Sequence, residues 1–147
     1  MYRNIKYIII NFFKGLKNLY YYREVIWNDK SFDYTFLYTY LKAKLKLDYE
    51  FYKNEGFTVS SDKVAEEILL AIKLCEKLEV EYYENEMFEL DSNTFIEKYK
   101  GKYNRIKKRN PSLGDREIIG LISEYNNNQC KELFFKLLRY KINTWWD

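Results

Sequence analysis

The sequence predicts an all-α protein, one helical domain over residues 1–147 that forms a bundle of about five helices with a long C-terminal helix. Apolar side chains recur every three or four residues in successive segments, which is the period of a helix. No run of useful length alternates polar and apolar residues, and no Asn-Gly or Asp-Gly pair indicates a hairpin. Aromatic residues make up 20% of the chain, which favours a folded protein over a disordered one.

The first helix is expected over residues 5–20, where Ile, Phe and Leu side chains recur on one face and lysines lie elsewhere. We expect it to be the first core helix, although a basic amphipathic helix is also typical of a segment that lies on an anionic membrane. The second helix is expected over residues 33–54. Asp33 is its predicted N-cap, and Gly56 is expected to end it.

The third helix is expected to begin near Asp62 and carries the clearest apolar stripe of the chain, which runs as far as Tyr82. The fourth opens with Thr94-Phe95-Ile96-Glu97, a capping box in which the end residues satisfy each other's backbone donors. It is expected to continue to Arg109, and Pro111 follows as the breaker.

The last helix is expected to start near Asp115 and to reach Ile142. Its apolar stripe is interrupted by Asn126-Asn127-Asn128-Gln129, which predicts a solvated bulge or a kink.

The composition excludes several kinds of active site. The chain contains no histidine, which excludes Ser-His-Asp and Cys-His sites and histidine-ligated zinc. Its two cysteines, Cys75 and Cys130, lie in apolar helical patterns and are expected to be buried and reduced. Asp29 and Asp33 are expected to cap a helix rather than to bind magnesium. The sequence therefore predicts a protein that is not an enzyme and has no cofactor, no metal site and no catalytic residue.

Charge is unevenly distributed along the chain. Residues 62–91 contain ten acidic and three basic residues, a net charge of −7. Residues 91–111 contain seven basic and two acidic residues, a net charge of +5. Such asymmetry is typical of a protein that attracts an anionic ligand or a charged partner, and equally of two helices that pair with each other.

A concentration of rings and charges, YYYREVIWNDKSFDY, is expected to link the first two helices. In one interpretation these rings meet Trp145 and Trp146 and close the bundle as a hydrophobic clasp. In the other they form a pocket for a planar anion, in which rings stack a base and cations hold its phosphate. The residues expected in that pocket are Tyr22, Arg23, Trp27, Tyr34, Lys42, Lys44 and Trp145.

Residues 98–109 predict an alternative surface that binds nucleic acid, because rings and cations lie on adjoining helical faces. The opposing interpretation is that Tyr99, Tyr103 and Ile106 face the core while the lysines are solvated. The cations of this surface are Lys98, Lys100, Lys102, Arg105, Lys107, Lys108 and Arg109. A third alternative is a homo-oligomer that buries the linker rings between subunits.

Three stretches, IWNDKSFDY, VAEEILLAIKLCEKLEVEYY and KELFFKLLRYKINTWWD, resemble a family of small proteins encoded by tailed bacteriophages. The resemblance covers about Arg23 to Asp147, and the middle of this chain is shorter and more basic than the family pattern. It implies a phage origin, a cytoplasmic location in a bacterial host cell and an accessory role, and it transfers no site residue.

The resemblance leads us to expect a phage-encoded, non-enzymatic inhibitor of a bacterial defence system. It would bind a nucleotide immune signal or a defence protein stoichiometrically. The alternative is a nucleic-acid-binding accessory protein that uses the basic face of residues 98–109. No membrane span is expected, because Lys6, Asn11 and Lys14 interrupt the one apolar run, which is much shorter than the ~20 residues needed.

Overall fold

The computed structural model describes residues 2–29, 33–55 and 61–145 of the 147-residue chain. Within these residues the fold is entirely helical, so the predicted all-α class and the long C-terminal helix are confirmed. The expected number of helices was too low, because seven are present in the described ranges. They are α1 (Tyr2–Trp27), α2 (Thr35–Glu55), α3 (Ser61–Glu79), α4 (Tyr82–Glu89), α5 (Ser92–Lys98), α6 (Lys100–Arg109) and α7 (Asp115–Lys141).

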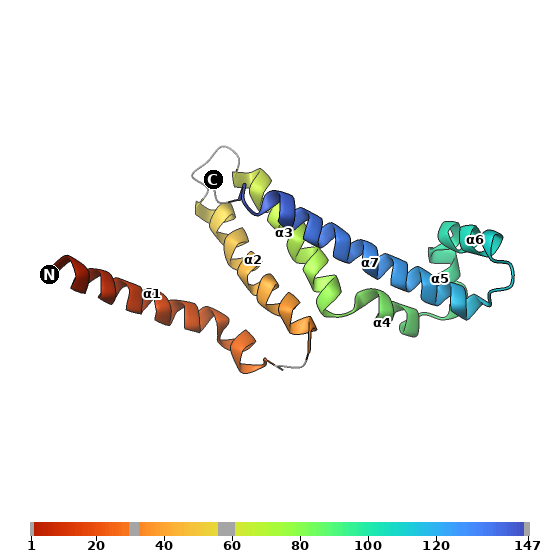
Figure 1. Ribbon diagram of the computed structural model, residues 1–147, viewed down its shortest axis with the longest axis horizontal. Coiled ribbons are helices and arrows are strands. Elements are labelled where there is room, and N and C mark those ends of the chain that lie inside the picture. The colour runs from red at the N-terminus through yellow and green to blue at the C-terminus, as the bar shows by residue number, and fades with distance from the viewer. Residues whose placement is uncertain (1, 30–32, 56–60, 146–147) are drawn as a thin grey trace.

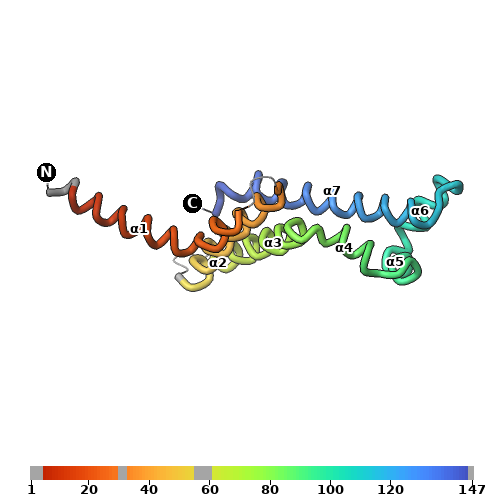
Figure 2. The backbone as a smooth tube through the Cα atoms, turned by 90° about the horizontal axis from the view of Figure 1, so that it is seen from below, coloured from red at the N-terminus to blue at the C-terminus, as the bar shows by residue number. Residues whose placement is uncertain are grey.

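The helices form an elongated assembly in which α7 is the longest and most central element (Figure 1). α2 packs against α3, and α7 packs along α4 in its N-terminal half and along α3 in its C-terminal half. The short helices α5 and α6 contact the N-terminal part of α7 at one end of the molecule, and α1 extends from the other end (Figure 2).

Two backbone breaks account for the additional helices. At Glu81 the backbone is left-handed, with φ 47°, which ends the predicted third helix and begins α4. The amide of Asn85 donates a hydrogen bond to the exposed carbonyl of Val80 at 2.6 Å, which supports this turn. At Tyr99 the backbone departs from helical geometry, with φ −110° and ψ 24°, and divides the predicted fourth helix into α5 and α6.

The predicted capping box at Thr94 is wrong, because α5 begins earlier and is capped by Asp91. A carboxylate oxygen of Asp91 accepts hydrogen bonds from the backbone amides of Asn93 and Thr94, at 3.0 and 3.1 Å. Thr94 therefore lies inside the first turn of α5. The predicted cap at Asp33 is supported, since its carboxylate accepts a hydrogen bond from the amide of Thr35 at 2.9 Å.

The apolar side chains form two separate cores. The larger lies between α2, α3 and α7, and its fully buried members include Ile68, Cys75 and Phe134. The smaller lies between α5, α6 and α7, around Phe95 and Ile122. Both cysteines are buried, as the sequence predicts, and they form no disulfide with each other. Because α7 contributes to both cores, it holds the two ends of the bundle together.

The predicted bulge in the last helix is absent, because α7 runs without a break through the polar residues 126–129. Asn126 is buried, and its amide oxygen accepts a hydrogen bond from Lys102 of α6. Gln129 donates to the hydroxyl of Tyr125, one turn earlier, at 2.9 Å. Gln129 thus finds its partner on α7 itself and the Asn126 oxygen finds one on α6, so the backbone stays regular.

The expectation for α1 as a core helix is wrong. Its apolar side chains are exposed to solvent along the whole described helix, and only Tyr22 and Val25 are half-buried against the bundle. The helix also continues to Trp27, so residues 20–27 belong to α1 and not to a linker. None of the described helices combines the length and the apolarity needed to cross a bilayer.

The predicted aromatic clasp does not form among the described residues. Trp145 is 2% exposed and packs in the larger core, and its indole nitrogen donates to Glu67 of α3 at 3.2 Å. Lys141 donates to the other oxygen of Glu67 at 2.7 Å. Trp27, by contrast, is 87% exposed. The C-terminal turn is therefore closed on α3, and not on the rings that precede α2; Trp146 lies outside the described residues.

This difference gives a test of the fold. Replacing Trp145 with alanine should destabilise the protein by about 3–5 kcal/mol, because it empties a large site in the core. The matched substitution Trp27→Ala removes the same atoms from an exposed position and should change stability by less than about 0.5 kcal/mol. Urea unfolding followed by circular dichroism measures both, and equal losses for the two variants would contradict the packing described here.

Candidate functional site

Two adjoining hollows, which together we name the Lys102 groove, lie where α6 and the middle of α7 meet the shorter helices. The α6 pocket, of about 270 Å³, is lined by Lys102, Arg105, Ile106, Arg109, Ile122 and Tyr125. The α4 pocket, of about 330 Å³, is lined mainly by side chains of α3, α4 and α7. Lys102 lines both pockets and joins them.

The α6 pocket has a basic wall and an aromatic wall. Lys102, Arg105 and Arg109 are spaced by three and four residues, which places them on one face of α6. Tyr125 of α7 lies across from them and is 51% exposed, and its ring centroid is 4.8 Å from the Lys102 amine. Among the described residues Arg105 and Arg109 form no ion pair. Both guanidinium groups are therefore available to an anion.

The α4 pocket places lysines over tyrosine rings. The amine of Lys77 on α3 lies 5.1 and 5.5 Å from the ring centroids of Tyr82 and Tyr83 on α4. The amine of Lys98 lies 5.6 Å from the ring of Tyr99. These distances are within the range of cation–π attraction, so each amine is attracted to a neighbouring tyrosine ring.

Glu86 is the buried carboxylate that organises this pocket. It accepts hydrogen bonds from Lys98, from the hydroxyl of Tyr99 at 2.6 Å and from that of Tyr82 at 3.1 Å. Burial by itself would raise the pKa of Glu86, but these three hydrogen bonds outweigh burial and hold the pKa below its ordinary value. Burial, followed by the bond to Glu86, raises the pKa of Tyr99, so that hydroxyl stays protonated and donating.

Asn126 places a buried and unsatisfied donor in the wall of the α4 pocket. The residue is 5% exposed, and its amide oxygen accepts a hydrogen bond from Lys102. The amide nitrogen is buried without a hydrogen-bond partner in the described part of the chain. A buried donor of this kind costs about 1–3 kcal/mol, which a ligand that offers a carbonyl or phosphate oxygen would recover.

The groove contains four of the seven cations that the sequence predicts for a nucleic-acid surface: Lys98, Lys102, Arg105 and Arg109. The other three, Lys100, Lys107 and Lys108, line neither pocket. Lys100 pairs with Glu97 at 3.1 Å, and Lys107 donates to the carbonyl of Leu113 at 2.6 Å. Tyr99, Tyr103 and Ile106 pack against the smaller core, as the opposing interpretation expected, and the cations beside them still reach the groove.

Several residues of the groove were missed by sequence reasoning because they come from other helices. Lys77 lies within the acidic segment, where a single lysine carries no signal, and the polar run at Asn126 was interpreted as a bulge. The alternation of rings and cations that predicted this surface occurs only in the segment that forms α6, so it gave no signal for the other helices. The missed residues are Lys77, Tyr82, Tyr83, Tyr125, Asn126 and Gln129.

The seven residues predicted to hold a planar anion do not meet in one pocket. Tyr34 donates to Glu81 beyond the C-terminal end of α3 at 2.6 Å, and that hydrogen bond, with burial second, raises the pKa of Tyr34 to about 12. Lys42 is paired with Glu79 and Lys44 with Asp48. A phosphate at either lysine would have to compete with a carboxylate already bound there.

The remaining members are farther apart. Trp145 contacts Glu67, twelve residues before Glu79 on α3, which corresponds to roughly 18 Å along a helix. On α1, Trp27 is exposed, Tyr22 is half-buried, and the Arg23 guanidinium lies 4.2 Å from the ring of Tyr20. Trp145 is therefore separated from Lys42 by the length of the α2–α3 pair. Helix α1 does approach Lys42, because Tyr21, Glu24 and Val25 line a hollow of about 680 Å³ with it, but Tyr22, Arg23 and Trp27 do not line that hollow.

Comparison with known proteins adds no identification: no protein-family model, curated protein or solved structure matches the chain. The resemblance to phage accessory proteins thus stays a prediction. Within the described residues, no three His, Cys, Asp or Glu side chains are grouped so that they could hold a metal ion.

The role of Glu86 can be tested through the pH dependence of stability. Glu86→Gln should cost about 1–3 kcal/mol at neutral pH, because it removes a charged acceptor from three donors in a buried site. The pKa of this carboxylate is lower in the folded state than its ordinary value of 4.5, so its contribution is complete above that value and is lost as the pH falls through the folded pKa. The stability difference between wild type and variant should therefore shrink under acid conditions.

Chemical denaturation at several pH values measures this difference. Glu89→Gln, on an exposed position of the same helix, is the matched control and should remain close to wild type at every pH. A Glu86→Gln variant as stable as wild type at neutral pH would show that the carboxylate does not organise the pocket.

Proposed function

We propose that the chain is a non-enzymatic nucleic-acid-binding protein that holds a single strand of RNA or DNA in the Lys102 groove. The observation that carries this proposal is the convergence of cations and exposed tyrosine rings from five helices on one groove. The proposal is the alternative function predicted from residues 98–109, now with a larger and different set of residues.

The charge of the groove favours a phosphate backbone as the ligand. Five cations line it, namely Lys77, Lys98, Lys102, Arg105 and Arg109. Lys98 is paired with the buried carboxylate of Glu86, and the other four form no ion pair among the described residues. A strand that follows α6 would meet Arg105 and Arg109 in turn, and each phosphate contact would release condensed counterions.

The rings favour a single strand over a duplex, because bases are available for stacking only when they are unpaired. Tyr125 in the α6 pocket and Tyr82 in the α4 pocket are exposed, and each presents a face or edge to the groove. Stacking on such a ring contributes about 1–3 kcal/mol per base and tolerates any sequence. The free amide nitrogen of Asn126 would add one directional contact to a base or phosphate oxygen.

A second candidate is capture of a nucleotide immune signal, which would make the chain the inhibitor of a bacterial defence system that its resemblance implies. The specific observation in its favour is the α4 pocket, where a buried donor and stacked lysine–tyrosine pairs occur in a hollow of about 330 Å³. Both candidates use the residues of the α4 pocket, and they differ in the length of the ligand. A nucleotide would fill the α4 pocket alone, whereas a strand needs both pockets.

The contribution of the α6 cations can be measured by fluorescence anisotropy with a labelled, unstructured oligonucleotide. The double variant Arg105→Ala with Arg109→Ala should bind at least about tenfold more weakly, because each lost phosphate contact removes a favourable electrostatic term. The slope of log K against log salt should fall by roughly two, one for each arginine.

The matched control is Arg23→Ala with Arg139→Ala, which removes the same charge from exposed arginines outside the groove. It should bind within about twofold of wild type at equal salt, since loss of net charge alone acts weakly at a distance. If this control lost affinity and the groove variant kept it, the strand would lie outside the groove, at Arg23 or Arg139, and the proposal would be wrong. Tight binding of a mononucleotide or cyclic nucleotide, with no gain from longer oligonucleotides, would favour the second candidate.

Stacking on Tyr125 can be separated from phosphate binding. Tyr125→Leu keeps a bulky apolar side chain but removes the ring, so affinity should fall by about five- to a hundredfold, as expected for one stacked base. The salt slope should stay at its wild-type value because no cation is lost. Tyr140→Leu, an exposed tyrosine elsewhere on α7, is the control and should leave binding unchanged. A Tyr125→Leu variant with wild-type affinity would contradict stacking at this ring.

A further inference from the structure

Helix α1 presents a long apolar surface, interrupted by Arg23, that no other described helix buries. We name it the α1 stripe. Its members share one face of the helix by their spacing of three and four residues, and each is at least 46% exposed. They are Ile5, Ile8, Ile9, Phe12, Phe13, Leu16, Leu19, Tyr20, Ile26 and Trp27. A surface of this extent on one helix is unusual for a protein that meets only water.

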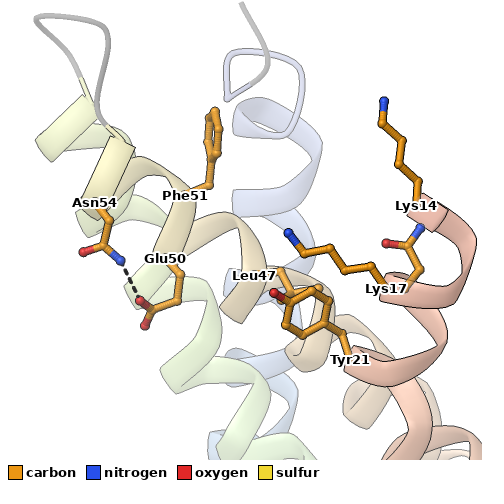
Figure 3. Close-up of a pocket in the computed structure, with 8 residues that line it drawn as sticks. Lys14, Lys17, Tyr21, Leu47, Glu50, Phe51 and Asn54 are labelled. Carbon is orange, nitrogen blue, oxygen red and sulfur yellow. Dashed lines mark hydrogen bonds between the residues drawn. The ribbon is translucent and has the colours of Figure 1, made fainter. Parts of the chain in front are cut away.

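The polar face of α1 is turned toward the bundle, and of the stripe only Leu19 and Ile26, at one edge, line a hollow with Tyr40 of α2. Lys14, Lys17, Asn18 and Tyr21 line a hollow of about 470 Å³ whose other wall is α2, and Figure 3 shows Lys17 and Tyr21 reaching toward that helix. A helix that stabilises a bundle does the reverse and buries its apolar face. Packing among the described residues therefore leaves most of the α1 stripe exposed.

The charges of α1 indicate what kind of partner would bind to the α1 stripe. Residues 1–27 contain five basic residues, and Glu24 is their single acidic residue. Two copies of α1 paired through their stripes would bring lysines against lysines, which opposes self-association. A bilayer that contains anionic phospholipids offers both missing features, acyl chains for the stripe and headgroup phosphates for the cations.

We propose that α1 binds anionic membrane surfaces, lying in the plane of the interface with its stripe in the headgroup–acyl boundary. Its 26 residues correspond to roughly 39 Å of helix, and its cations exclude a span across the hydrocarbon. Lys6 and Lys17 adjoin the stripe on the helix and would extend to phosphates while their methylene stems stay apolar. This inference rests on α1 alone and is independent of the nucleic-acid proposal.

Co-sedimentation of the full chain with vesicles tests the proposal. The protein should pellet with vesicles of phosphatidylcholine mixed with phosphatidylglycerol and stay in the supernatant with phosphatidylcholine alone. Ile9→Ser with Phe12→Ser, in the centre of the stripe, should weaken binding by about tenfold or more, since two large side chains lose their burial. Emission of Trp27, on the same stripe, should shift to the blue with anionic vesicles, measured against a Trp27→Phe variant.

Tyr7→Ser with Ile10→Ser is the matched control, because it removes one ring and one isoleucine, both exposed, from the other side of α1. It should bind anionic vesicles within about twofold of wild type, as the stripe is intact. Three results would overturn the proposal: no binding to anionic vesicles, equal binding to phosphatidylcholine alone, or equal losses for both double variants. A dimer in lipid-free sedimentation velocity that Ile9→Ser with Phe12→Ser dissociates would also overturn it and assign the stripe to a second copy.

Discussion

The packing of α7 along the molecule is the constraint on which the rest of the structure depends. Its 27 residues provide Cys130 and Phe134 to the larger core and Ile118 and Ile122 to the smaller one. Between these two apolar regions the buried face of α7 is polar, at Ser123 and Asn126. Their partners come from other helices: Ser123 donates to the Tyr83 carbonyl at 2.7 Å, and Asn126 accepts from Lys102. The Lys102 groove opens beside this polar region, where neither core fills the space.

The groove also depends on the shortness of the helices around it. Because α3 ends before Glu81 and the next helices have fewer than three turns each, their ends bring tyrosines and lysines from separate segments to one region of α7. Glu86 then fixes Lys98 and Tyr99 from one buried position. A single continuous helix from residue 61 to 89 would have carried Tyr82 and Tyr83 past this region. The break at Glu81 is thus a condition for the site as well as for the fold.

Periodicity was enough to predict the class, the long last helix and the buried cysteines, since each follows from local spacing. It did not reveal the breaks at Glu81 and Tyr99, because neither residue is a glycine or proline and only tertiary packing selects their backbone angles. The spacing of Lys102, Arg105 and Arg109 indicated half of the groove. The other half, including Lys77 and Asn126, depends on contacts between segments far apart in the chain. Amphipathicity identified the apolar face of α1 but not its partner, since a helix pattern is the same whichever surface covers it.

Helix α1, which carries the stripe, and helix α6, which lines part of the Lys102 groove, lie at opposite ends of the molecule (Figure 1). Cations accompany both surfaces, but the two surfaces fit different ligands. The stripe is broad and apolar, so salt should weaken its proposed lipid contacts only in part, while the groove relies on phosphate contacts that salt weakens steeply. The packed helices α2, α3 and α7 lie between these two ends. If both proposals hold, a strand bound at α6 would lie at the end of the bundle away from the membrane-bound helix, so the two ligands would not compete for space.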